Sequence, residues 1–112
     1  MFFVIFVETT LFTRLITDLV SDADYATFQQ QLVEFPEKGD LLVGCGGVRK
    51  VRMAAKGKGA SGGARILYLH IPNRDLIYLL TLFTKNNAAN LSAEGKKTVR
   101  ALAEAIKQAH RS

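Results

Sequence analysis

The sequence contains one cysteine, two prolines and no tryptophan. Cys45 has no second cysteine to pair with, and the chain shows no Cys-x-x-Cys motif and no zinc-site spacing of Cys and His. We therefore expect neither a disulfide framework, nor a metal site, nor a cofactor, and we expect a reducing compartment. Cys45 stands among glycines, where we expect it only to fill space.

A long hydrophobic run is also missing. The apolar opening at residues 2–7 is interrupted by Glu8, has no basic segment in front of it and is far shorter than a membrane span. We therefore interpret it as a strand, and expect a cytoplasmic protein with no membrane partner. The 112 residues, 48% of them hydrophobic, suffice for one continuous core, so we expect a single domain over residues 1–112.

Acidic residues are absent from residues 41–74, although the whole chain has 10 of them against 15 Lys and Arg. The basic residues of this segment are Arg49, Lys50, Arg52, Lys56, Lys58, Arg65 and Arg74. A concentrated positive segment attracts phosphates and favours a nucleic acid as the partner. The alternative is a solvated hairpin whose lysines keep it soluble and prevent pairing between strand edges.

The first part of the chain predicts one strand and two helices. Residues 2–7 combine β-branched and aromatic side chains without polar alternation, which predicts a strand buried on both faces. Apolar residues then recur at helical spacing behind Thr9 or Thr10, either of which can cap a helix. A second helix begins at Ser21 and is stopped by Pro36.

Three further strands and a helix follow. The strands cover residues 48–54, 64–71 and 76–83, and the last is apolar throughout, so we expect it to be central in the sheet. Residues 36–40 and the glycine-rich residues 56–63 are loops by composition, and residues 72–75 form a turn. Ser92 caps the final helix. The order βααβββα predicts an α+β fold with helices on a mostly antiparallel four-stranded sheet.

Alternation along the strand at residues 48–54 places Lys50 and Arg52 on one face and Arg49 on the other. Pairing of the hairpin would bring Arg65 beside Arg52 or the loop lysines. Groups for proton transfer are sparse, because we expect His70 to be structural and His110 to lie in a frayed tail.

Two stretches, GGVRKVRMAAKGKGASGGARILYLHI and IYLLTLFTKN, closely resemble the HigB branch of the RelE/ParE toxin superfamily, and the resemblance covers nearly the whole chain. It implies an endoribonuclease toxin that enters the ribosomal A site and cuts the bound message without a metal. The ribose 2′-hydroxyl attacks the adjacent phosphate and a cyclic phosphate forms. The implied partners are mRNA on the 70S ribosome and a helix-turn-helix antitoxin of the HigA type, through which alone the complex binds operator DNA.

The resemblance also implies roles for single residues. It implies that the catalytic residues are Arg65, Arg52, Lys50 and Lys85. It implies that the residues contacting RNA are Arg49, Lys56, Lys58 and Asn86. Relatives that place a tyrosine or a histidine after the last strand have a group for proton transfer there, whereas this chain reads TKNNAANLS. The general acid and base are therefore unassigned. The alternative function is that of a ParE-like or non-catalytic toxin, which acts by binding gyrase or RNA.

Overall fold

The computed structural model describes residues 3–55, 63–84 and 91–111, in which three helices pack on a five-stranded sheet. The elements in chain order are β1 (Ile5–Glu8), α1 (Thr10–Leu19), α2 (Asp22–Glu34), β2 (Asp40–Leu41), β3 (Arg49–Met53), β4 (Ala64–Ile71), β5 (Leu76–Thr84) and α3 (Ala93–Ala109). A short 3-10 turn, Pro72–Arg74, joins β4 to β5. The predicted α+β class is confirmed, but the sheet has five strands where four were expected.

The additional strand is β2, which begins at Asp40, the last residue of the segment 36–40 that the sequence predicts to be a loop. The strand order is β1-β5-β4-β3-β2, with β1 parallel to β5 and every other neighbouring pair antiparallel. The predicted burial of the first strand on both faces is wrong, since β1 is an edge strand whose Ile5 is 53% exposed. β5 lies inside the sheet, as expected, but β4 is the middle strand.

The helix starts follow the predicted caps. The hydroxyl of Thr9 accepts a hydrogen bond from the Phe12 backbone N–H at 3.0 Å, so Thr9, not Thr10, caps α1. Ser21 and Ser92 cap α2 and α3 in the same way. These side-chain oxygens satisfy backbone N–H groups that have no partner within the helix.

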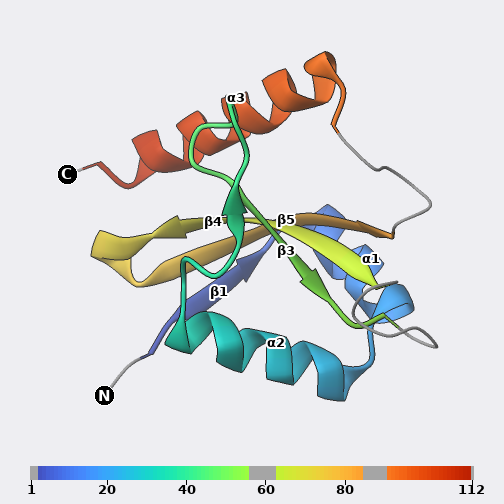
Figure 1. The fold of residues 1–112 in the computed structure, drawn as a ribbon. Coiled ribbons are helices and arrows are strands. Elements are labelled where there is room, and N and C mark those ends of the chain that lie inside the picture. Colours follow the sequence, from blue (N-terminus) through green and yellow to red (C-terminus); the bar gives the residue numbers. More distant parts are fainter. Residues whose placement is uncertain (1–2, 56–62, 85–90, 112) are drawn as a thin grey trace.

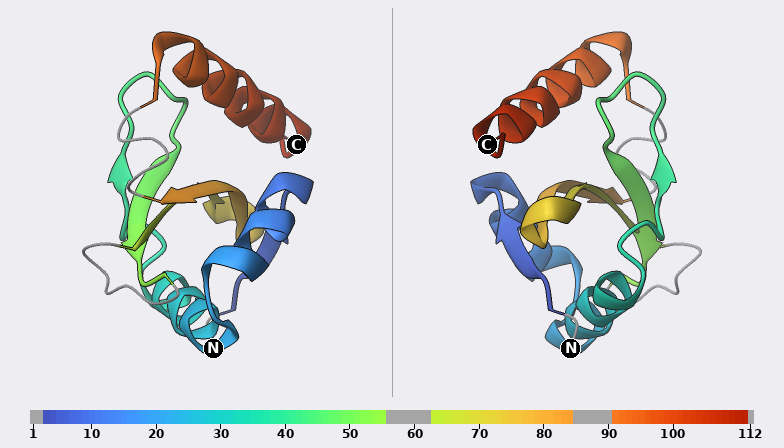
Figure 2. Two further views of the ribbon diagram at one scale, coloured as in Figure 1. Left: turned by 90° about the vertical axis from the view of Figure 1, so that its right-hand side faces the viewer. Right: turned by 90° about the vertical axis from the view of Figure 1, so that its left-hand side faces the viewer.

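The three helices lie on both faces of the sheet (Figures 1 and 2), with α3 on one face and α1 and α2 on the other. Each face therefore has its own apolar core. The core beneath α1 and α2 includes Phe12, Ile16, Phe28, Leu32, Val51, Met53, Ile66 and Tyr68. The core beneath α3 includes Cys45, Val48, Leu67, Leu69, Ile71, Leu80 and Ala103. Within the described ranges, no helix is long and apolar enough to cross a membrane.

The loop between β2 and β3 packs against α3. Gly46 has a φ of +71°, and a Cβ built on it would lie 3.1 Å from the Ala103 Cβ, so the loop requires a small residue there. The neighbouring Cys45 is fully buried, as expected of a residue that fills space. This contact ties the edge of the sheet to α3 and fixes the path by which β2 reaches β3.

Candidate functional site

The pairing of β3 with β4 gathers three basic side chains. Arg52 lies directly opposite Arg65 in the antiparallel register, as expected from the sequence. Lys50 precedes Arg52 by two residues and therefore projects from the same face of β3. We call Lys50, Arg52 and Arg65 the cationic cluster.

The cationic cluster lies on the α3 side of the sheet, at the end that α3 leaves uncovered. Val48 of β3 and Leu67 of β4 belong to the core beneath α3, and the residues two places further on this face are Lys50 and Arg65. The sheet face thus changes from apolar to basic where the covering helix ends.

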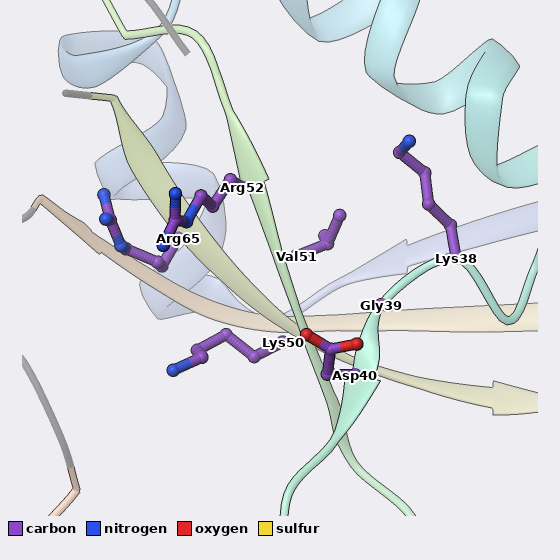
Figure 3. Close-up of a pocket in the computed structure, with 7 residues that line it drawn as sticks. All are labelled: Lys38, Gly39, Asp40, Lys50, Val51, Arg52 and Arg65. Carbon is purple, nitrogen blue, oxygen red and sulfur yellow. The ribbon is translucent and has the colours of Figure 1, made fainter. Parts of the chain in front are cut away.

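The cluster opens into a hollow of about 370 Å³. Its lining residues are Lys38, Gly39, Asp40, Lys50, Val51, Arg52 and Arg65. Figure 3 shows the side chains of Lys50, Arg52 and Arg65 extending to the same side, with the Asp40 carboxylate beside the base of Lys50 and Lys38 further away. The hollow therefore has three converging positive charges and one negative charge at its edge.

The cations of the cluster are largely free to bind a ligand. In the described part of the chain, the side chains of Lys50 and Arg52 have neither a hydrogen bond nor an ion pair. Among the described residues, Arg65 donates one bond, from Nη1 to the Gly63 carbonyl at 3.1 Å, which orients the guanidinium and leaves its other N–H groups without a partner there. Such an arrangement suits a phosphodiester, whose oxygens accept charge-assisted hydrogen bonds.

Arg49 does not join the cluster. It lies opposite Tyr68 in the register, and its Nη1 donates to the backbone carbonyl of Gly39 at 2.7 Å and to that of Glu37 at 3.3 Å. Its Nη2 lies 4.0 Å from a Glu37 carboxylate oxygen. These contacts hold the segment between α2 and β2 against the sheet.

Tyr68 of β4 also holds the segment between α2 and β2. Its buried hydroxyl donates to the Pro36 carbonyl at 2.8 Å and accepts from the Gly39 N–H at 2.9 Å. Burial raises the pKa of Tyr68, so the hydroxyl remains a donor at physiological pH. A Cβ on Gly39 would lie 2.9 Å from both the Lys50 carbonyl oxygen and Tyr68 Cε1, so only glycine lets the segment approach β3 this closely.

Asp40 and Lys38 are the charged lining residues that sequence reasoning missed. They lie next to Gly39 in the segment interpreted as a loop, and β2 is too short to show an alternating pattern. The sequence held only an indirect signal for their position. Tyr68, whose hydroxyl bonds to this segment, belongs to β4, the strand that also carries Arg65.

The other residues singled out from the sequence divide into two groups. Lys56, Lys58, Lys85 and Asn86 lie outside the described residues. His70 and His110 are described, and neither lines the hollow. His110 is not frayed as expected, since it ends α3 with its Nε2 2.7 Å from the Tyr78 hydroxyl oxygen. Across the described ranges, no three His, Cys, Asp or Glu side chains are grouped so that they could hold a metal ion.

A protein-family comparison identifies the family of the chain. The family model described as the RelE toxin of the RelE/RelB toxin–antitoxin system matches residues 9–112. The match includes both strands of the cationic cluster and the segment that carries Asp40. Because it covers far more than half of the sequence, the chain belongs to the RelE family of toxins of toxin–antitoxin systems.

Proposed function

We propose that this protein is a ribosome-dependent endoribonuclease that cuts translated mRNA in the ribosomal A site. The observation that carries the proposal is the convergence of Lys50, Arg52 and Arg65 on one open hollow, two of them without any side-chain partner in the described chain. Membership of a toxin family supports the proposal, because such a toxin must act on a target whose loss arrests growth, and translated mRNA is such a target.

The proposed reaction requires positive charge at the phosphate. Attack of the ribose 2′-oxygen on phosphorus produces a pentavalent transition state with additional negative charge on the non-bridging oxygens. Preorganised donors directed at that charge stabilise the transition state more than the ground state, and removing one donor typically costs on the order of 10²–10³ in rate.

Arg65 is the residue that we propose to hold the scissile phosphate. Its guanidinium stays charged at any physiological pH and can bind two phosphate oxygens at once. The bond to the Gly63 carbonyl limits its rotation, which favours a single orientation. Lys50 and Arg52 then stabilise the charge from the neighbouring strand, and we retain Lys85 as a further catalytic cation.

The proposal also includes residues that contact the RNA. We retain Lys56, Lys58 and Asn86 as RNA contacts, and add Lys38 because it lines the hollow. Arg49 has a different role in the proposal, since its bonds to the Gly39 and Glu37 carbonyls support the rim of the hollow. Its contribution to RNA binding is indirect.

We propose the following partners for this toxin. The first is mRNA on the 70S ribosome, and the second is a cognate helix-turn-helix antitoxin of the HigA type that neutralises the toxin in the cytoplasm. Operator DNA is bound only through the antitoxin in the complex. The toxin–antitoxin description of the matching family supports the antitoxin, while its type rests on the resemblance of the motifs.

The test is to induce the protein in cells and map the 5′ ends of cellular mRNA. We expect cuts within translated messages, in phase with codons, and we expect Arg65→Ala to lose them while it still binds antitoxin. Arg14→Ala is the matched control, because Arg14 is exposed on α1 and does not line the hollow. Growth arrest with intact mRNA and with inhibited gyrase supercoiling would instead favour the ParE-like alternative.

A further inference from the structure

The strand register places a carboxylate next to the cationic cluster. Asp40 lies directly opposite Lys50 in the antiparallel pairing of β2 with β3, so the two side chains share a face. Opposite residues in such a pair have Cβ atoms about 5 Å apart, and diagonal neighbours about 7–8 Å apart. Asp40 is therefore a side neighbour of Lys50 and a diagonal neighbour of Arg52.

The position of Asp40 is fixed by the structure around it. Gly39, the preceding residue, is bonded through its N–H to the Tyr68 hydroxyl and through its carbonyl to Arg49. Asp40 itself pairs with β3 through its backbone. The backbone that carries the carboxylate is thus anchored at the strand edge, and support by a rigid element helps to place a group for proton transfer.

The Asp40 carboxylate is also available. Within residues 3–55, 63–84 and 91–111 it accepts no hydrogen bond and forms no ion pair, although four basic residues line the same hollow. Figure 3 shows Lys50 extending away from it. A carboxylate without a side-chain partner can accept a proton or a hydrogen bond from a ligand.

The other described groups of the hollow cannot take this role. The Lys and Arg side chains are charged donors with no lone pair to accept a proton. The Tyr68 hydroxyl already bonds to Pro36 and Gly39, and the two histidines do not line the hollow. Asp40 is the one lining residue in the described chain whose side chain can accept a proton.

We propose that Asp40 is the general base of the RNA cleavage, an inference that rests on the function proposed above. One carboxylate oxygen takes the proton of the ribose 2′-hydroxyl, and the 2′-oxygen forms a bond to phosphorus. The bond from phosphorus to the 5′-oxygen breaks, and this oxygen leaves with the electron pair and takes a proton from water. The products are a 2′,3′-cyclic phosphate and a 5′-hydroxyl.

The distribution of charge suits this step. The carboxylate lies at the edge of the hollow, where it meets the nucleophile, while the cationic cluster lies where the phosphate gains charge. General base catalysis typically contributes about 10²–10⁴ in rate. Loss of Asp40 is therefore expected to slow the chemical step without removing the cations that bind RNA.

The experiment compares Asp40→Asn with wild type in single-turnover cleavage of mRNA bound to purified 70S ribosomes. We expect the rate at saturating toxin to fall by about 10²–10⁴, with binding to the programmed ribosome and the melting temperature unchanged. Asp40→Glu should recover part of the rate. The control is Asp18→Asn, which removes an exposed carboxylate on α1 that does not line the hollow. Asp40→Asn cutting at the wild-type rate would overturn the inference.

A second substrate separates a base from an acid. In an RNA whose scissile 5′-oxygen is replaced by sulfur, the leaving group needs no proton. Asp40→Asn should remain slow on this RNA, because the 2′-hydroxyl still has to lose its proton, whereas recovery of the wild-type rate would show an acid and overturn our assignment. A wild-type protein that leaves ribosome-bound mRNA intact would instead refute the proposed function, and with it the role of Asp40.

Discussion

The two faces of the β3–β4 hairpin use their polar residues differently. Arg49 and Lys50 are adjacent in sequence, yet Arg49 is bonded to two backbone carbonyls, while the Lys50 side chain has no bonded partner in the described chain. Tyr68, opposite Arg49, is bonded on both sides of its hydroxyl, whereas Arg52 and Arg65 face the open hollow. One face builds the rim of the site and the other presents the charges.

This difference shows that one basic segment performs two tasks. Alternation along a strand sends consecutive cations to opposite faces, and the surroundings of each face then determine what the cation does. Substitutions on the Arg49 side are expected to lower stability more than activity. Substitutions on the Lys50 side are expected to lower activity more than stability.

Among changes on the two faces of the β3–β4 hairpin, the largest effect is expected from the arginine pair. Arg52→Ala and Arg65→Ala should each reduce single-turnover cleavage on the order of 10²–10³. The double variant should lose less than the product of the two, because both guanidinium groups act on the same phosphate. Unfolding in urea should show stabilities close to wild type. Fully multiplicative losses would show that the two arginines act on separate phosphates.

The next effect is expected at Tyr68. Tyr68→Phe leaves the Gly39 N–H and the Pro36 carbonyl without their partner, which should lower the free energy of unfolding by about 1–3 kcal/mol. Since this segment carries Asp40, cleavage should fall as well. Denaturant titration together with the cleavage assay checks both results. Unchanged stability would contradict the anchoring role of the hydroxyl.

A smaller effect separates the two adjacent cations most directly. Arg49→Ala removes bonds to two carbonyls and should cost about 1 kcal/mol of stability. Lys50→Ala should change stability by less than about 0.5 kcal/mol, because the half-buried Lys50 side chain has no bonded partner in the described chain, yet it should slow cleavage. Thermal melting and single-turnover cleavage, measured on both variants, check this prediction. If the two variants behave alike, the distinction between the faces fails.

The smallest effect concerns pH on the Arg49 side. Burial lowers the pKa of His70 below its usual 6.5, with a further lowering by Arg49 and opposing effects of Glu37 and Asp75. As pH falls through 6.5 toward the folded-state pKa, the unfolded chain takes up the proton first, so stability decreases. His70→Asn should flatten this decrease slightly between pH 8 and 5. A melting profile that keeps its full pH dependence in the variant would assign the effect to another group.

Much of the fold follows from local patterns. The bounds of β4 agree with those expected, because β-branched and aromatic residues fill a segment between a glycine-rich stretch and a turn. The caps at Ser21 and Ser92 could be predicted from the sequence, because a single side-chain oxygen determines where a helix begins. By contrast, the apolar pattern of β1 did not distinguish an edge strand from a buried one.

The site was predictable only in part. The grouping of Lys50, Arg52 and Arg65 follows from alternation and hairpin pairing, both of which are local rules. The position of Asp40 depends on a two-residue strand that forms because Gly39 approaches β3 closely and Tyr68 holds it there. Such a contact joins residues 29 positions apart and leaves no periodic signal in the sequence.

The most direct test of the account is the single-turnover cleavage of a ribosome-bound message by wild type, Arg65→Ala and Arg14→Ala. We expect wild type and Arg14→Ala to cut the message in the A site and leave a 2′,3′-cyclic phosphate. Arg65→Ala should be slower on the order of 10²–10³ while keeping its fold and its antitoxin binding. An intact message with wild type, or equal rates for all three proteins, would contradict the assignment of the cationic cluster as the catalytic site.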